Sequence, residues 1–487
     1  MDVPSEQRRR SRLATFGRLV LLVAVLALAV VLALLAFRPG SSLSTQAEDP
    51  IGTAVVENPS PGRLIEANGS LFFVAKDPTF GRELWRSDGT EAGTVLIKDI
   101  RPGAHGSGPS EFARVGERVF FTANDGVSGR ELWMSDGTAD GTVLVDDIMP
   151  GAKGSVPYAF ADVGGTLFFT ADDGVHGDEL WASDGTAEGT RLVHSIRRGP
   201  TGSNPQELVS SNGLAFFTAC DGIHGCELWR SDGTSSGTTL VRDETDGLGS
   251  APGWLTDVDG TLFFTPSGGN SGELWRTDGS PGGTVLVRDF TKGEDCAFGR
   301  YYYFDFCVTE LAASDGTLFF VASKLPRLRE LYTSDGTRSG TVLVKDLSRR
   351  GSSWPTELTD VAGTLFFVAR GRGVGNELWR TDGTPENTVL VKDIVSGRGD
   401  STPYELTAVD DVIFFWPQGL APGAELWMSD GTDSGTVLVR DILPGVENAF
   451  LAELTAVGDS LFFVAMDGEA SHLWTSDGTE QGTTLLL

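Results

Sequence analysis

Short apolar and β-branched runs, separated by glycine-rich turns, follow one another along most of this chain. The stretch 158–198 shows the pattern clearly, with strand-like runs at 158–163, at 166–170, at 179–183 and from 191 onward. Gly164-Gly165 and Asp172-Asp173-Gly174 predict turns between these runs, because glycine adopts a positive φ without steric cost. The runs lack a helical period. The pattern therefore predicts four short antiparallel strands.

This four-strand unit is repeated nine times, and each copy carries the phrase Glu-Leu-Trp-x-x-Asp-Gly-Thr or a close variant. The Asp of the Asp-Gly step marks each copy, at Asp88, Asp136, Asp184, Asp232, Asp278, Asp335, Asp382, Asp430 and Asp477. Successive intervals are 48, 48, 48, 46, 57, 47, 48 and 47 residues. Because four-stranded blades arranged radially make a β-propeller, we predict an all-β propeller of nine blades. Eight blades are the alternative, since propellers typically have about 4–8.

The aromatic residues of the repeat are predicted to form its core. A Phe-Phe doublet occurs in every copy, from 72–73 to 462–463. Adjacent strand residues point to opposite faces, so each doublet should pack against both neighbouring blades. A tenth copy of the fourth strand lies at 52–57, before the first doublet. Its pairing with the C-terminal strands within one blade would remove a free sheet edge.

The Asp-Gly turn of each copy has a structural explanation. Its Asp side chain is predicted to cap backbone N–H groups a few residues ahead. Each turn offers one dependable carboxylate, whereas calcium prefers about 6–8 oxygen ligands. We therefore expect no cofactor, and calcium is the open alternative.

An apolar segment precedes the repeats. Residues 19–37 carry no charged or polar side chain, and as a helix they would span roughly 28 Å, close to the thickness of a bilayer core. Five Arg residues precede them, which predicts a cytoplasmic N-terminus. We predict a cytoplasmic basic segment at 1–18, a transmembrane signal anchor at 19–37, a linker at 38–51 and the propeller at 52–487. The protein is then a single-pass protein of the bacterial cell envelope, with the repeats outside the cytoplasm. Secretion after signal cleavage is the alternative.

The four cysteines fit an exported protein, because disulfides persist in oxidising compartments. Local pairing would join Cys220 to Cys226 and Cys296 to Cys307, and free buried cysteines are the alternative. The second pair brackets an aromatic loop inside the 57-residue interval. Its candidate binding residues are Tyr301, Tyr302, Tyr303, Phe304 and Phe306. Loops on rigid scaffolds often carry function, so this loop is a candidate binding site, with a structural cover as the alternative.

The formal net charge of −29 excludes one class of partner. Residues 1–40 contribute +4, so the remainder carries −29 − 4 = −33. Such an acidic body repels phosphates, and we expect no nucleic acid partner. His176 and His224 occupy the same loop position in adjacent copies. With Asp173 and Asp221 they form a candidate metal set, although descent of the repeats from one ancestor explains the pair better.

The phrase that carries the period, ELWRSDGTEAGT at 83–94, resembles the bacterial ELWxxDGT repeat family over roughly residues 52–487. Tyr332, His472, Ser280 and Asn387 depart from the pattern. The resemblance implies a repetitive surface or secreted protein and brings no catalytic residues with it.

No single set of nucleophile, base and orienting acid stands out in the sequence. We therefore predict a membrane-anchored extracytoplasmic propeller that is a binding, adhesion or interaction scaffold and not an enzyme. Its expected partner is a protein or glycan at the cell surface. It should also contact the membrane through residues 19–37. The alternative is a propeller enzyme of the cell envelope, either a hydrolase or a quinone-dependent oxidoreductase.

Overall fold

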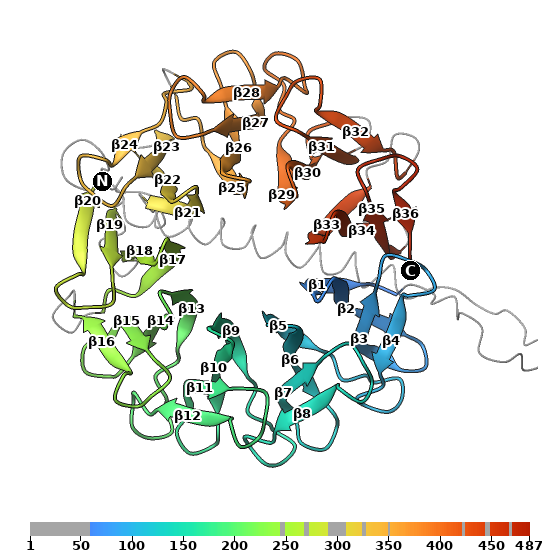
Figure 1. Cartoon of the computed structure of the whole chain (residues 1–487), viewed down its shortest axis with the longest axis vertical. Helices are drawn as coiled ribbons and strands as arrows, with labels where there is room; N and C mark the ends of the chain where they lie inside the picture. Colours follow the sequence, from blue (N-terminus) through green and yellow to red (C-terminus); the bar gives the residue numbers. More distant parts are fainter. Residues whose placement is uncertain are drawn as a thin grey trace, which may run out of the picture. The chain divides into compact units, whose positions relative to one another are not determined.

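The computed structural model describes residues 59–487, except 244–248, 267–271, 291–307, 324–327, 349–350, 421–423, 444–448 and 467–469. These residues form nine four-stranded antiparallel sheets, each built from four strands that are consecutive in sequence. Figure 1 shows the sheets as blades around a ring, with the first strand of each blade nearest the centre. The prediction of nine blades is confirmed, and the alternative of eight is wrong.

The strands of the first five blades have the following bounds. Blade 1 contains β1 (Gly62–Ala67), β2 (Ser70–Asp77), β3 (Gly81–Ser87) and β4 (Val95–Lys98). Blade 2 contains β5 (Ser110–Val115), β6 (Arg118–Asn124), β7 (Arg130–Ser135) and β8 (Val143–Asp146). Blade 3 contains β9 (Tyr158–Val163), β10 (Thr166–Asp172), β11 (Asp178–Ser183) and β12 (Arg191–His194). Blade 4 contains β13 (Gln206–Ser211), β14 (Leu214–Cys220), β15 (Cys226–Ser231) and β16 (Thr239–Arg242). Blade 5 contains β17 (Pro252–Val258), β18 (Thr261–Pro266), β19 (Glu273–Thr277) and β20 (Val285–Asp289).

The other four blades repeat the arrangement. Blade 6 contains β21 (Val308–Ser314), β22 (Thr317–Ser323), β23 (Arg329–Ser334) and β24 (Val342–Leu343). Blade 7 contains β25 (Thr356–Val361), β26 (Thr364–Arg370), β27 (Asn376–Thr381) and β28 (Val389–Lys392). Blade 8 contains β29 (Pro403–Val409), β30 (Val412–Pro417), β31 (Leu426–Ser429) and β32 (Val437–Arg440). Blade 9 contains β33 (Phe450–Val457), β34 (Ser460–Met466), β35 (Ser471–Ser476) and β36 (Thr484–Leu485).

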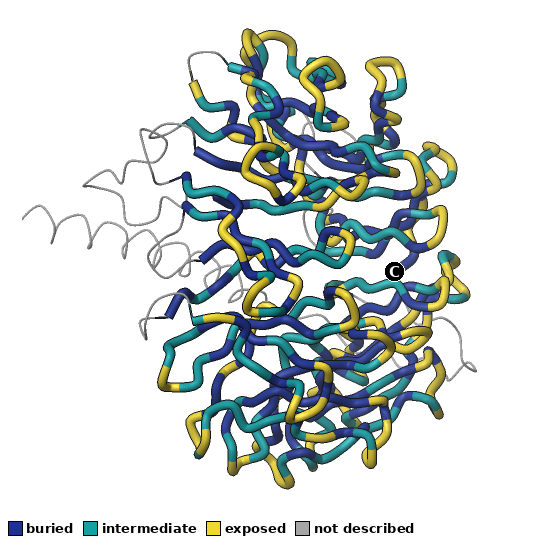
Figure 2. Tube along the Cα trace, turned by 60° about the vertical axis from the view of Figure 1, so that its left-hand side comes forward, coloured by how far each residue is buried: buried dark blue, intermediate teal, exposed yellow. Residues whose placement is uncertain are grey.

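The core lies between neighbouring blades, as the Phe doublets predict. Phe72 packs in one cluster with Phe121 of blade 2, whereas Phe73 packs in another with Phe462 of blade 9. All eighteen doublet residues are buried. Figure 2 shows that the buried residues run through the strands and that the exposed ones gather in the loops. Each blade is therefore a two-sided buried sheet, which explains why every strand 2 needs two adjacent aromatic residues.

The Asp-Gly turns are capped as predicted. In blade 3, the Asp184 Oδ1 atom accepts hydrogen bonds from the N–H of Thr186 at 2.9 Å and from its hydroxyl at 2.7 Å. The Ser183 and Thr190 hydroxyls bond to each other beneath the turn at 2.8 Å. These bonds hold the Asp184 carboxylate in its ionised form and lower its pKa. The capped turn thus joins β11 to β12.

In six of the nine blades, the buried Glu of the repeated phrase bonds to a Ser that precedes the next blade. Glu131 is fully buried, and its Oε1 atom accepts the N–H of Ser155, which precedes blade 3, at 2.8 Å. The Ser155 hydroxyl donates to the other carboxylate oxygen. We call this contact the Glu–Ser latch. Equivalent pairs are Glu83 with Ser107, Glu179 with Ser203, Glu227 with Ser250, Glu330 with Ser353 and Glu377 with Ser401.

The ring closes between blade 9 and blade 1 through side chains. The Glu453 carboxylate of blade 9 accepts the N–H of Leu64 at 3.0 Å. Leu71 and Phe73 of blade 1 pack with Val457 and Phe462. All four strands of blade 9 come from residues 450–485. Among the described strands, no blade therefore combines strands from the N-terminal and C-terminal ends of the chain. The strand predicted at 52–57 lies outside the described residues.

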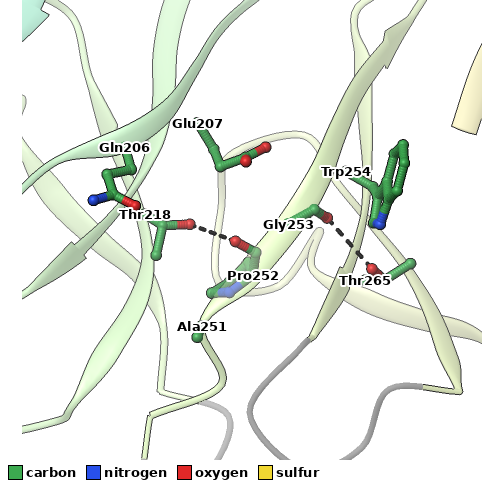
Figure 3. A pocket seen from close by; sticks show the side chains of 8 residues that line it. All are labelled: Gln206, Glu207, Thr218, Ala251, Pro252, Gly253, Trp254 and Thr265. Carbon is green, nitrogen blue, oxygen red and sulfur yellow. Dashed lines mark hydrogen bonds between the residues drawn. The ribbon is translucent and has the colours of Figure 1, made fainter. Parts of the chain in front are cut away.

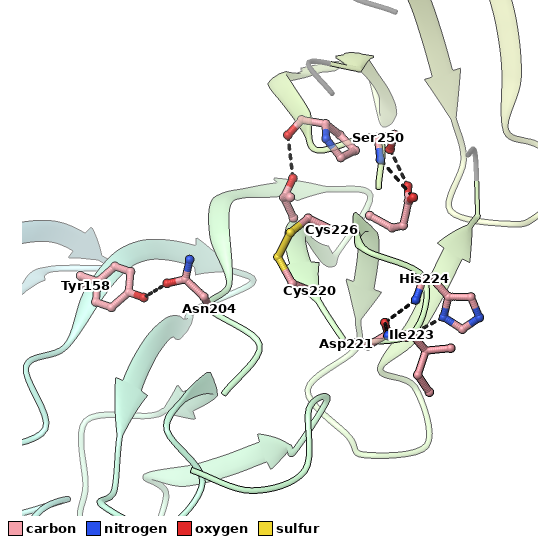
Figure 4. The surroundings of a disulfide bond; sticks show 11 residues. Tyr158, Asn204, Cys220, Asp221, Ile223, His224, Cys226 and Ser250 are labelled. Atoms are coloured by element: carbon pink, nitrogen blue, oxygen red, sulfur yellow. Dashed lines mark hydrogen bonds and ion pairs between the residues drawn. A yellow bond between two sulfur atoms is a disulfide. The ribbon is translucent and has the colours of Figure 1, made fainter. Parts of the chain in front are cut away.

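Several other predictions also fall outside the described residues. These are the basic segment 1–18, the anchor 19–37, the linker 38–51, the pair Cys296–Cys307 and the aromatic loop Tyr301, Tyr302, Tyr303, Phe304 and Phe306. Within the described part of the chain, no helix is long and apolar enough to cross a membrane. The predicted disulfide between Cys220 and Cys226 is present, at the end of the β14–β15 hairpin (Figure 4).

Candidate functional site

Each innermost strand is interrupted by a β-bulge, and one residue of the bulge has a positive φ between 50° and 59°. We call these nine residues the bulge ring. They are Arg63, Glu111, Ala159, Glu207, Trp254, Glu310, Glu357, Glu405 and Glu453. Left-handed backbone at a residue other than glycine is uncommon and is often found at functional sites. Here it recurs in every blade, so the bulge itself belongs to the scaffold, and the side chains it presents differ.

Three consecutive carboxylates of the bulge ring accept hydrogen bonds from the backbone of the next blade. The Oε2 atom of Glu357 accepts the N–H of Leu406 at 3.3 Å, and that of Glu405 accepts the N–H of Leu454 at 3.2 Å. Glu453 bonds to Leu64 in the same way. These carboxylates are thus fixed in place by the backbone of the neighbouring bulge.

Glu310 and Glu357 form the most perturbed carboxylate pair of the bulge ring. They lie on β21 and β25, which are neighbouring innermost strands (Figure 1). Burial raises the pKa of Glu310 to about 7, and the negative charge of Glu357 adds to this rise, while Arg329 opposes it. Burial also raises the pKa of Glu357, against the hydrogen bond from the N–H of Leu406. At neutral pH, one carboxyl can therefore hold a proton beside a second that is ionised.

An exposed aromatic ring lies close to this pair in the chain. Trp354, three residues before Glu357, keeps 49% of its surface exposed. The Arg329 guanidinium stacks over its ring at 5.1 Å from the centroid. The backbone N–H of Trp354 donates to the Arg329 carbonyl at 3.3 Å, which ties the segment to β23. The surroundings therefore combine a carboxyl pair, a cation and an indole face, a set suited to a polar ligand with apolar faces.

The two histidines of the candidate metal set do not combine into one site. His176 bonds through Nδ1 to Asp173 of its own loop at 2.7 Å, and His224 bonds likewise to Asp221 at 2.6 Å (Figure 4). Among the described residues, no group of three or more His, Cys, Asp or Glu side chains is placed to hold a metal ion.

The bulge ring was missed by reasoning on the sequence, although a signal was present. Aligning the nine copies on their Phe doublets places Glu in six of nine copies at one position of the first strand. The alternating pattern of apolar and polar residues does not single out this position. A strand register shifted by a bulge cannot be read from periodicity.

The chain was compared with known proteins. No protein-family model and no curated protein matches it. Among solved structures, a puromycin hydrolase is similar with 16% identity and a TM-score of 0.37, over 77% of this chain and 63% of the other. A prolyl endopeptidase is similar with 13% identity and a TM-score of 0.41, over 75% of this chain and 56% of the other. The GH74 enzyme of Niastella koreensis gives 11% identity and a TM-score of 0.36, over 88% and 71%.

The similarity corrects one prediction. The matched structures are enzymes, which contradicts the expectation of a scaffold without catalysis and agrees better with its alternative, a propeller enzyme. The chain spans about three fifths of the length of the first of these proteins. At such low identity the similarity assigns neither a substrate nor a catalytic residue to this chain.

Proposed function

We propose that this protein is a propeller hydrolase that cleaves glycosidic bonds, with Glu310 and Glu357 as its catalytic carboxyl pair. The observation that carries the proposal is their placement on neighbouring innermost strands, beside an exposed tryptophan and an arginine. Most glycoside hydrolases use two carboxyl groups in environments that keep one protonated and the other ionised.

The chemistry follows from the two environments. Glu310, with its pKa near neutrality, donates its proton to the oxygen of the departing sugar. The ionised Glu357 either removes a proton from an attacking water or attacks the anomeric carbon itself. In the first case, Glu357 ends protonated and Glu310 ionised, and exchange with solvent restores both. In the second, a covalent glycosyl-enzyme forms, and Glu310 then acts as base for the water that releases it.

Trp354 and Arg329 are suited to hold the substrate. The half-exposed indole offers a flat apolar face on which a pyranose ring can stack. The positive charge of Arg329 acts to lower the pKa of Glu310. Its guanidinium can donate to sugar hydroxyls beside the reacting bond. Neither residue provides a nucleophile, so both would act in positioning.

We also propose that the enzyme acts in the bacterial cell envelope. This part rests on the apolar segment 19–37 with its preceding arginines and on the Cys220–Cys226 disulfide, which needs an oxidising compartment. Membership of the ELWxxDGT repeat family agrees with such a location and stays a prediction. Glycans of the envelope are then the substrates within reach.

The test is a hydrolysis assay with the full-length protein on a panel of 4-methylumbelliferyl glycosides and purified envelope glycans. Hydrolysis of at least one substrate is expected, and Glu310→Gln and Glu357→Gln should each lower kcat by about 10²–10⁴-fold. Glu111→Gln is the matched control, since it changes a bulge-ring carboxylate of blade 2 and should leave kcat unchanged. Absence of hydrolysis across the panel, or full activity in both variants, would rule the proposal out.

A further inference from the structure

A cavity of about 520 Å³ opens between blades 4 and 5, away from the Glu310–Glu357 pair. It is lined by the innermost strands β13 and β17 and by the strands behind them, β14 and β18 (Figure 3). The side chains on its walls include those of Gln206, Glu207, Thr218, Trp254 and Thr265. A volume of this size is typical of small-molecule sites.

Gly253 is one of the residues that line the cavity, and it adds no side chain to it. The register of the innermost strands places Gly253 opposite Thr265, where Gln206 lies opposite Thr218 and Tyr158 opposite Thr170. In blade 3, the Tyr158 hydroxyl reaches across to Asn204 of the next blade at 2.7 Å (Figure 4). A Cβ at Gly253 would meet no atom within 4 Å. The position thus leaves open space in blade 5, where blades 3 and 4 carry Tyr158 and Gln206.

Glu207 is also free to bind a ligand. At Gly62, the equivalent glycine of blade 1, a Cβ would meet the Glu453 carboxylate at 3.3 Å, and Glu453 bonds to Leu64. Glu207 is the counterpart of Glu453, yet it is exposed and has no hydrogen-bond or ion-pair partner among the described residues. Its carboxylate therefore keeps its full capacity to accept hydrogen bonds inside the cavity.

The remaining walls supply a flat apolar face and fixed polar edges. Trp254 is 45% exposed, at a bulge-ring position that holds Glu in six other blades. The hydroxyls of Thr218 and Thr265 donate to the carbonyls of Pro252 and Gly253, at 2.7 Å and 3.4 Å, so both are committed to shaping the wall. The exposed amide of Gln206 lies beside Glu207 and can both donate and accept.

We infer that this cavity is a saccharide-binding subsite, in which Trp254 stacks on a pyranose ring while Glu207 and Gln206 bond to its hydroxyls. A sugar ring has one apolar C–H face and a rim of hydroxyls, which matches one exposed indole beside one carboxylate and one amide. A small organic cation is the competing ligand, because Trp254 and Glu207 alone would also attract positive charge. The amide and the single aromatic wall, in place of an aromatic cage, favour the sugar. This subsite deepens the proposed function, since it would hold a glycan chain at a point separate from the reacting bond.

The test is isothermal titration calorimetry of the full-length protein with cellobiose, maltose and N,N′-diacetylchitobiose, and with tetramethylammonium as the cation. At least one disaccharide should bind. Trp254→Ala should weaken that binding by about tenfold or more, since it removes the stacking face. Gly253→Leu should abolish binding, because the leucine side chain would occupy the open space at this position. The φ of Gly253 lies outside the left-handed region, so the substitution adds no backbone strain.

Two controls separate this inference from the proposed function. Glu111→Gln changes a bulge-ring carboxylate of blade 2, outside the cavity, and should leave disaccharide affinity unchanged. Glu310→Gln should keep the binding that depends on Trp254. Retained binding in Glu310→Gln together with lost hydrolysis supports both proposals, whereas binding without any hydrolysis refutes the catalytic proposal only. The subsite is refuted if no disaccharide binds, if Gly253→Leu binds like the unaltered protein, or if tetramethylammonium alone binds and depends on Trp254.

Discussion

The Glu131 carboxylate accepts both the N–H and the hydroxyl of Ser155, twenty-four residues later and at the entrance to the next blade. Glu131 and Ser155 are both fully buried. Loss of the carboxylate would leave two polar groups of Ser155 unsatisfied, at about 1–3 kcal/mol for each group. We expect Glu131→Ala to lower the free energy of unfolding by about 2–4 kcal/mol, measured by urea denaturation. Glu91→Ala changes an exposed Glu of the blade 1 turn and is the control; an equal loss there would contradict the role of the latch.

The same latch makes stability depend on pH. Burial raises the pKa of Glu131 from 4.5 to about 7, although Ser155 opposes the rise. The folded state therefore binds more protons than the unfolded chain between these values, and the stability that Glu131 contributes at low pH is lost as pH rises through them. Glu131→Gln removes the titration and keeps hydrogen-bonding atoms in place. Between about pH 4.5 and pH 8, the unaltered protein should lose up to about 3 kcal/mol more than Glu131→Gln. Parallel stability curves for the two proteins would contradict this assignment.

The pH dependence of hydrolysis should report Glu310. If Glu310 is the general acid, the reaction needs its protonated form, and kcat/KM should fall as pH rises through about 7. Glu357→Gln removes the neighbouring negative charge that raises the pKa of Glu310. The alkaline limb of the residual activity should therefore shift to lower pH. An alkaline limb that does not move in Glu357→Gln would argue against coupling between the two carboxyls.

Glycine in the repeated turn is explained by the Asp carboxylate that it faces. A Cβ at Gly189 would overlap the Asp184 carboxylate. In blade 7 the position holds Asn387, whose side-chain amide donates to Asp382 at 2.5 Å. We expect Gly189→Ala to cost about 1–3 kcal/mol of stability, because the cap must move. Asn387→Ala keeps the Cβ already accommodated there and should cost less, about 0.5–1.5 kcal/mol for one hydrogen bond. A larger loss for Asn387→Ala, seen in thermal unfolding, would overturn this explanation.

The Cys220–Cys226 disulfide should stabilise blade 4 only modestly. It closes a short loop that is already held by hydrogen bonds from the N–H groups of Ile223 and His224 to Asp221, each at 2.8 Å. Loop-closure entropy for such a loop is about 2 kcal/mol. The double variant Cys220→Ser/Cys226→Ser should lose about that much in urea denaturation and keep the β14–β15 hairpin. Failure of the double variant to fold would show that the disulfide has a larger role.

The predictable part of this molecule is the part that every blade needs. The Phe doublets, the capped Asp184 turn and the four strands of blade 3 repeat nine times, so local propensity and period agree on them. The bulge ring was not predictable in the same way. Its φ values arise at β-bulges, where the register between the first two strands of a blade shifts, and the environment of Glu310 depends on Glu357, forty-seven residues later in the next blade. The cavity beside Trp254 is lined by residues of two neighbouring blades, so no pattern within one repeat predicts it.

The closure of the ring has a consequence for how such molecules evolve. Blade 9 meets blade 1 through the Glu453–Leu64 bond and a shared apolar cluster, the same kind of contact that Glu357 and Glu405 make elsewhere. No described blade is assembled from both ends of the chain, so each repeat is a complete module. Duplication or deletion of one repeat in a gene would then change the circumference of the ring while neighbouring blades still meet through the same kind of contact. Such a ring is free to vary in size while the residues at its centre diverge one blade at a time.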